Sequence, residues 1–184
     1  MFRAPPRLIR GVPRARLFGA LDRAATLTLT LVCAPPGSGK TTLVSDWVNA
    51  RRDLGHLWFT LDERANTAGT LASALWSELA ELTSLAPDGE HGMLGLGEAL
   101  VGVDPPAADI VVVLDDAQEL TDRTAWRAFD HLLSMTPPWL HWIVISRADP
   151  PIGVRRLQMN GRLAQVRAAD LAADPAEAGE LLSS

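Results

Sequence analysis

The chain has 184 residues, of which 47% are hydrophobic, and this size and composition suit one globular domain. Its net charge of −5 argues against a segment that binds nucleic acid by itself. The longest apolar run, residues 110–114, is far too short to cross a bilayer, and the basic, proline-broken start lacks the apolar stretch of a signal peptide. A cytoplasmic protein without membrane contacts is therefore expected.

Cysteine, histidine and lysine usage narrows the chemistry further. Cys33 is the only cysteine, which excludes an intramolecular disulfide, and the four histidines show no spacing typical of metal ligands. Sixteen arginines accompany a single lysine, Lys40. Six of these arginines crowd the first 23 residues, where they form either a solvated basic arm or a surface from which one or two face a bound phosphate or base.

Strand and helix patterns alternate along the whole chain. A short amphipathic helix around residues 17–21 precedes a first strand at 27–33, and residues 86–108 are the least defined region. Further strands are predicted at 56–61, 110–115, 140–146 and 163–166, and further helices at 40–52, 70–82, 93–101, 124–135 and 151–160, with one more opening at Asp174. This alternation predicts an α/β fold with a parallel sheet covered on both faces. We divide the chain into a basic, proline-rich arm with a short helix (1–24), a nucleotide-binding domain (25–172) and the start of a further helical segment (173–184).

The segment from Ala34 to Thr42 has the spacing of a P-loop, the Walker A motif. Gly37 and Gly39 let the backbone turn its N–H groups inward, and together with Pro36, Ser38 and the start of the following helix they form a nest for phosphates. Lys40 would reach the β- and γ-phosphates, for which a compact ammonium suits better than a planar guanidinium. Thr41 would supply a hydroxyl to Mg²⁺, and Thr42 would hydrogen-bond the α-phosphate.

A second motif follows in register. The apolar strand from Ile110 to Leu114 ends in Asp115 and Asp116, which is the Walker B pattern. Asp115 would hold the shell of Mg²⁺, and Asp116 would orient or deprotonate an attacking water. The fourth strand ends at Ser146 and Arg147, where a cation can sense the γ-phosphate; the alternative for Arg147 is a salt bridge on the helix side.

The chain resembles the N-terminal nucleotide-binding domain of the large ATP-binding LuxR-type (MalT-like) transcriptional regulators, which belong to the STAND signalling ATPases. The generic part of this likeness is the P-loop, and the more particular parts are the Asp-Asp pair and a Ser-Arg-x-Asp-Pro-Pro stretch. The stretches that carry it are residues 12–17, 34–43, 113–118, 146–151, 161–163 and 167–171.

The resemblance implies a five-stranded P-loop NTPase sheet of the ASCE type, in which a sensor strand lies between the Walker A and Walker B strands. It implies that Val12 and Arg14 approach the adenine and that Arg147 is the sensor. It also implies a switch that holds ADP at rest and self-associates when ATP is bound, with Mg²⁺-dependent hydrolysis that is slow. The helix-turn-helix of such regulators is absent from this segment, so no direct DNA binding by it is expected.

Two other functions compete with this switch. A small P-loop phosphotransferase would use the same loop, with Arg155 and Arg156 as lid arginines. An inactive remnant would only mediate protein contacts. Phosphate transfer to an acceptor would support the first alternative, and loss of nucleotide binding would support the second.

Overall fold

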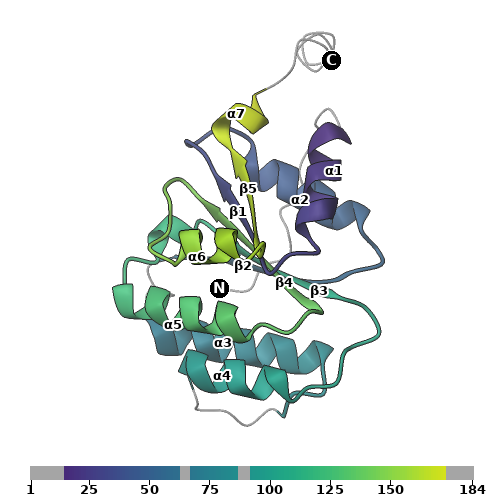
Figure 1. Ribbon diagram of the computed structural model, residues 1–184, viewed down its shortest axis with the longest axis vertical. Helices are drawn as coiled ribbons and strands as arrows, with labels where there is room; N and C mark the ends of the chain where they lie inside the picture. Colours follow the sequence, from purple (N-terminus) through teal and green to yellow (C-terminus); the bar gives the residue numbers. More distant parts are fainter. Residues whose placement is uncertain (1–14, 63–66, 87–91, 173–184) are drawn as a thin grey trace.

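The computed structural model describes residues 15–62, 67–86 and 92–172 (Figure 1). Its helices are α1 (Ala15–Ala24), α2 (Lys40–Ala50), α3 (Ala68–Leu82), α4 (Gly92–Val101), α5 (Arg123–Met135), α6 (Val154–Met159) and α7 (Ala168–Leu171), with a 3-10 turn, η2 (Ala117–Glu119). Its strands are β1 (Leu29–Cys33), β2 (Gly55–Thr60), β3 (Ile110–Asp115), β4 (Leu140–Ser146) and β5 (Leu163–Arg167). The five predicted strands are confirmed, with ends shifted by at most two residues.

The strands form one parallel sheet in the order β2-β3-β4-β1-β5. The strand that ends at Arg147, β4, therefore lies between the strand of the P-loop, β1, and the Walker B strand, β3. This confirms the predicted ASCE arrangement. Because all strands are parallel, their carboxyl ends meet at one edge, and the loops that follow β1, β3 and β4 are neighbours there.

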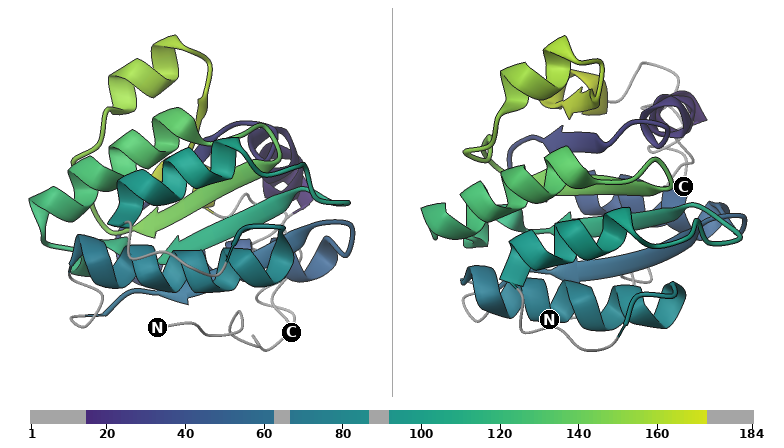
Figure 2. Two further views of the ribbon diagram at one scale, coloured as in Figure 1. Left: turned by 90° about the horizontal axis from the view of Figure 1, so that it is seen from below. Right: turned by 60° about the horizontal axis from the view of Figure 1, so that its bottom comes forward.

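Alternate residues of each strand face two separate cores, as the period of two requires. One face of β3 contributes Ile110, Val112 and Leu114 to a core shared with α3, α4, α5 and α6. The other face contributes Val111 and Val113 to a second core shared with α1 and α2. Figures 1 and 2 show the resulting layers, with α1 and α2 on one side of the sheet and α3, α4 and α5 on the other.

Helix α1 packs into the same core as the rest of the domain. Its Leu17 and Leu21 are buried against α2. The Asp22 carboxylate accepts hydrogen bonds of 2.8 Å from Trp47 Nε1 and from Arg51 Nε, both of which belong to α2 and its C-terminal end. The described part of the first predicted segment, residues 15–24, is thus joined to the nucleotide-binding domain by apolar and polar contacts.

One predicted helix begins later in the structure, and another lies outside the described residues. The prediction that a helix begins at Pro151 was wrong, because the chain turns tightly at residues 150–154 and α6 begins only at Val154. The N–H of Gly153, which precedes α6, donates instead to Asp130 Oδ1 of α5 at 3.0 Å. The helix predicted to open at Asp174 lies outside the described residues, and the short elements η2 and α7 were not predicted.

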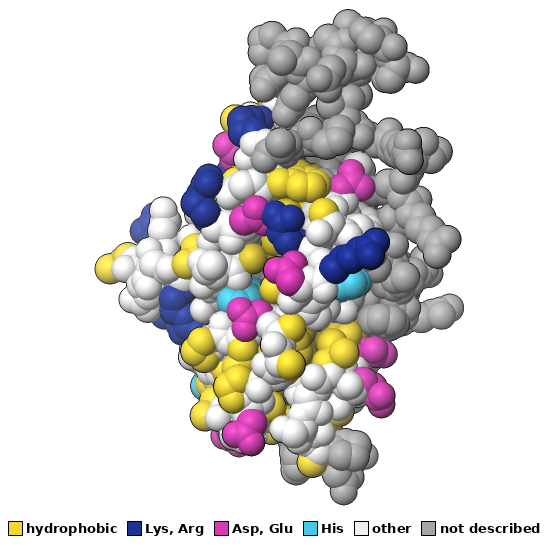
Figure 3. Space-filling model, turned by 90° about the vertical axis from the view of Figure 1, so that its right-hand side faces the viewer, with side chains coloured by type: hydrophobic (Ala, Val, Ile, Leu, Met, Phe, Trp, Pro, Cys, Tyr) yellow, Lys and Arg dark blue, Asp and Glu magenta, His cyan; other side chains and the backbone are white. Residues whose placement is uncertain are grey.

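The molecular surface carries charges of both signs. Figure 3 shows the side of the molecule that lies on the right in Figure 1. Basic and acidic side chains are interspersed on this side. Hydrophobic side chains gather in the lower part of this view, at the level of α3 and α4. Leu82 of α3 and Leu94 and Val101 of α4 are exposed large apolar residues. Among the helices that the structure describes, none combines the length and the apolar character that a membrane crossing requires.

Candidate nucleotide-binding site

The P-loop joins β1 to α2 through two glycines in the left-handed region. Gly37 has φ 76° and Gly39 has φ 81°. A Cβ at either position would meet no atom within 4 Å, so the backbone conformation, not lack of space, favours glycine here. Gly39 is the N-cap of α2, and no side chain caps this helix end. The N–H groups of Lys40, Thr41 and Thr42 in the first turn therefore remain available to an anion, which the helix dipole also favours.

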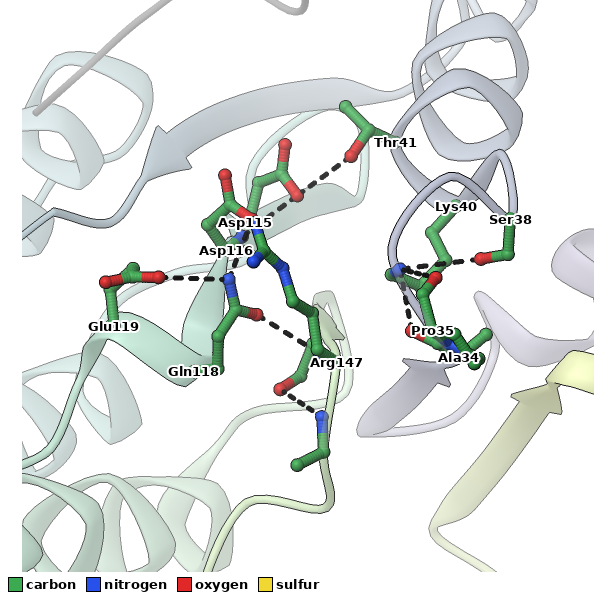
Figure 4. Close-up of polar contacts among 12 residues, drawn as sticks. Ala34, Pro35, Ser38, Lys40, Thr41, Asp115, Asp116, Gln118, Glu119 and Arg147 are labelled. Carbon is green, nitrogen blue, oxygen red and sulfur yellow. Dashed lines mark hydrogen bonds and ion pairs between the residues drawn. The ribbon is translucent and has the colours of Figure 1, made fainter.

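Lys40 brings a positive charge into the centre of the loop. Its side chain is 8% exposed. The ammonium donates to the carbonyl oxygens of Ala34 at 2.8 Å and Pro35 at 2.9 Å, and to Ser38 Oγ at 3.4 Å (Figure 4). The three donors of the ammonium are thus directed onto the loop itself, and a phosphate that entered the loop would meet this charge directly.

Thr41 and Asp115 meet across the carboxyl edge of the sheet. Thr41 Oγ1 donates to Asp115 Oδ1 at 3.1 Å, which joins the two predicted metal-binding residues. Asp115 is only 4% exposed, and this burial raises the pKa of its carboxyl. The N–H of Asp116, which donates to Asp115 Oδ1 at 2.9 Å, acts in the opposite direction, as do the Thr41 hydroxyl and the Lys40 charge.

These residues fit Mg²⁺ held together with a nucleotide. Within the described ranges, no group of three or more His, Cys, Asp or Glu side chains is placed to hold a metal ion. Mg²⁺ commonly binds through one or two protein oxygens, water and substrate phosphates, and a hydroxyl beside a carboxylate at the mouth of a phosphate loop suits that mode. The donor set of Thr41 and Asp115 is therefore compatible with a cation that arrives with its phosphates.

Asp116 and Arg147 form a second polar contact at the same edge. Asp116 has φ 53°, the one positive value among the described residues other than glycine, so the chain turns sharply after Asp115. Arg147 Nη2 lies 3.7 Å from Asp116 Oδ1. The ion pair joins the ends of β3 and β4. Arg147 is thus paired with a carboxylate at a strand end and not with a side chain of a flanking α-helix, and its role as a sensor stays a prediction.

Gln118, for which the sequence predicts no role, connects these two residues. Its Nε2 donates to Asp116 Oδ1 at 2.8 Å, and its Oε1 accepts from the backbone N–H of Arg147 at 3.1 Å (Figure 4). The only sequence signal was its position two residues after the Asp-Asp pair. Recognising the contact with Arg147 required knowing that β3 and β4 are neighbours.

A further ion pair fixes the loop that begins at Arg147. Asp149 pairs with Arg167 at the end of β5, which holds this loop against the strand on the far side of β1. Arg156, one of the two arginines considered for a phosphotransferase lid, donates to Asp130 Oδ1 at 3.0 Å and so ties α6 to α5. Val12 and Arg14, the predicted adenine contacts, lie outside the described residues.

A parallel sheet with this strand order, a P-loop between β1 and α2 and a carboxylate at the end of β3 defines a P-loop NTPase domain of the ASCE type. No established family model matches the chain. Over 178 residues, however, it is 32% identical to the HTH-type transcriptional regulator MalT of Serratia proteamaculans and 29% identical to that of Cronobacter sakazakii, alignments that cover 91% of the chain. The chain belongs to the family of MalT-like regulators, and it spans 20% of the length of these relatives.

Solved structures show the same fold at low sequence identity. A STAND protein with a tetratricopeptide repeat sensor from Pyrococcus horikoshii matches 97% of the chain and 26% of its own length, with a TM-score of 0.55 and 16% identity. A Walker-type ATPase of Pyrococcus abyssi matches 96% of the chain and 60% of its own length, with a TM-score of 0.52 and 16% identity. At such identities the likeness concerns the fold.

Proposed function

We propose that this domain is an ATP/ADP-binding switch of a transcriptional regulator of the MalT type, with slow Mg²⁺-dependent ATP hydrolysis. The observation that carries the proposal is that the two motifs meet in the folded domain. The Thr41 hydroxyl of the P-loop lies 3.1 Å from the Asp115 carboxylate of the Walker B strand. The alignment with MalT supports the regulatory setting.

Different residues of the chain bind different parts of the nucleotide. The backbone N–H groups of the P-loop and the N-terminus of α2 bind the α- and β-phosphates, and Lys40 neutralises the charge toward the γ-phosphate. Thr42 hydrogen-bonds the α-phosphate, and Val12 and Arg14 contact the adenine. Thr41 and Asp115 hold Mg²⁺, which supplies charge neutralisation at the phosphates when it is bound.

The state of the switch depends on the γ-phosphate. Arg147 is a partly exposed cation that is paired with Asp116 at 3.7 Å, and exposed pairs of this kind are weak, so a phosphate can compete for its guanidinium. Asp116, relieved of that pairing, orients or deprotonates the attacking water. In this scheme ADP holds the resting state, ATP favours self-association, and hydrolysis resets the domain.

Calorimetric titration with ATP and with ADP, with and without Mg²⁺, tests the proposal. Lys40→Ala should weaken binding of both nucleotides at least about 100-fold, because the charge-assisted bonds that a buried ammonium makes to phosphate are lost. Arg52→Ala is the matched control, since it removes one exposed positive charge just beyond the other end of α2 and should change affinity less than about twofold.

Binding that survives Lys40→Ala would refute the assigned P-loop role. No binding by a folded wild-type chain would support the alternative of an inactive remnant, and transfer of phosphate to a small acceptor would support the phosphotransferase.

A further inference from the structure

The orientation of the Gln118 amide is determined by its partners, of which Asp116 and Arg147 are the closest and Glu119 Oε1, at 3.4 Å from Nε2, is the third. The backbone N–H of Arg147 can only donate, so the atom that faces it at 3.1 Å must be the amide oxygen. The Asp116 Oδ1 atom accepts, so the atom that faces it at 2.8 Å is the amide nitrogen. Both ends of one side chain are therefore used, and a flipped amide would lose both hydrogen bonds.

The two partners belong to different strands. Asp116 follows β3, and Arg147 follows β4. Gln118 is held in η2, where the N–H of Glu119 donates to the carbonyl oxygen of Asp116 at 2.9 Å and closes the turn. The amide thus fixes the distance between the Asp116 carboxylate and the Arg147 backbone.

The Arg147 guanidinium is held less firmly than its backbone. Its side chain is 52% exposed, and its distance of 3.7 Å from Asp116 Oδ1 exceeds that of a hydrogen bond. The same Oδ1 accepts the shorter bond from Gln118. If the guanidinium turns away, Asp116 keeps a hydrogen-bond donor and the Arg147 backbone keeps its anchor.

We propose that Gln118 is the positioning residue through which the γ-phosphate sensor Arg147 and the water-orienting Asp116 are held in register. The inference rests on the proposed function, because it takes the roles of those two residues from it. Gln118 itself touches neither nucleotide nor metal. It lets the guanidinium exchange between the carboxylate and a phosphate while the atoms on either side stay in place.

The first test concerns the link itself and needs no nucleotide. Gln118→Met keeps the length of the side chain and removes both hydrogen bonds. Amide hydrogen exchange of Arg147, followed by NMR in the nucleotide-free chain, should become at least about tenfold faster. The amide of Val144, inside the fully buried strand β4, should keep its exchange rate in the same spectra, which separates loss of this bond from general loosening of the fold.

The second test concerns nucleotide preference. Gln118→Met should weaken ATP binding about 3- to 10-fold, the effect expected for one or two net hydrogen bonds, and change ADP binding less than about twofold. Gln158→Met is the control for the substitution itself, because Gln158 is exposed in α6 and lies shortly before the start of β5, at the opposite edge of the sheet. This variant should leave the ratio of the ATP and ADP dissociation constants unchanged.

The outcomes distinguish the inference from the proposed function. An Arg147 amide that exchanges equally slowly in Gln118→Met would overturn the link. A second outcome is faster amide exchange in Gln118→Met with an unchanged ratio of the ATP and ADP dissociation constants. If Lys40→Ala still abolishes nucleotide binding, this outcome would refute the effect of Gln118 on nucleotide preference and leave the proposed function intact. Nucleotide binding that is insensitive to Lys40→Ala would overturn the proposed function, while the amide-exchange result would still decide whether Gln118 joins the two strand ends.

Discussion

The two halves of the site are built in different ways. The phosphate half is one continuous segment, residues 34–42, whose shape depends on backbone conformation at Gly37 and Gly39. The other half combines Asp115, Asp116 and Gln118 with Arg147, and depends on side chains from two strand ends that meet only in the folded sheet. The first half is a local property of the chain, and the second is a property of the topology.

The largest effect is expected from a substitution in the phosphate half of the site that preserves the positive charge. Lys40→Arg should weaken ATP binding nearly as much as Lys40→Ala, by about 100-fold, although a guanidinium is also cationic. The single Lys40 Nζ atom donates to the carbonyl oxygens of Ala34 and Pro35 at 2.8 and 2.9 Å, and a longer, planar guanidinium does not reproduce this compact arrangement of donors.

Titration calorimetry measures this effect, and circular dichroism checks that the variant is folded. Affinity within about threefold of wild type would mean that charge alone, not the shape of the ammonium, is what the loop requires.

An intermediate effect is expected from the backbone of the same loop. Gly39→Ala places a Cβ on a residue with φ 81°, which costs on the order of 1–2 kcal/mol, and the loop should relax away from its phosphate-binding shape. Thermal unfolding should show the lost stability, and ATP affinity should fall about tenfold. Gly69→Ala is the control: Gly69 lies in the first turn of α3 with open space around it and without a positive φ, so alanine should be neutral or slightly stabilising. Equal melting temperatures for the two variants would contradict the argument.

The smallest effect is expected from a contact between segments far apart in the sequence. The Arg51 guanidinium, hydrogen-bonded to Asp22, holds the pKa of that carboxyl below its ordinary value of 3.8. A carboxyl with a lowered folded-state pKa stabilises the fold above its unfolded-state pKa, and this contribution disappears as the pH falls through the folded-state pKa.

Asp22→Asn should therefore lower the melting temperature by a few degrees at most near neutral pH, since the pair is partly exposed, and the difference should vanish in strong acid. Melting curves of both proteins across pH 2–7 provide the measurement. A difference that grows toward acid would show that another interaction of Asp22 dominates.

The contrast between the two halves also explains what the sequence alone could predict. The strands and the P-loop were predictable because their signals are local: the apolar run from Ile110 to Leu114, and glycine, lysine and threonine at fixed spacing. The place of β4 between β1 and β3 was implied by the family resemblance, not by periodicity.

The bridge through Gln118 was not predictable, because a glutamine after a strand has no local pattern and its partner, Arg147, is distant in the chain. The start of α6 was missed for a similar reason. Pro151 suits a first helical turn, but the Gly153 N–H is held by Asp130 of another helix, which outweighs the local preference.

The strand order has a consequence for how the protein is made. Strand β1 pairs with β4 and β5, so residues 29–33 have no sheet neighbour until residues 140–146 have been synthesised. At about 5–20 residues per second this delay lasts roughly 5–20 s, during which an apolar strand with free backbone groups leads directly into the P-loop. The nascent chain thus presents its nucleotide motif long before it can use it, and the emergence of β4 decides when a binding-competent domain first exists.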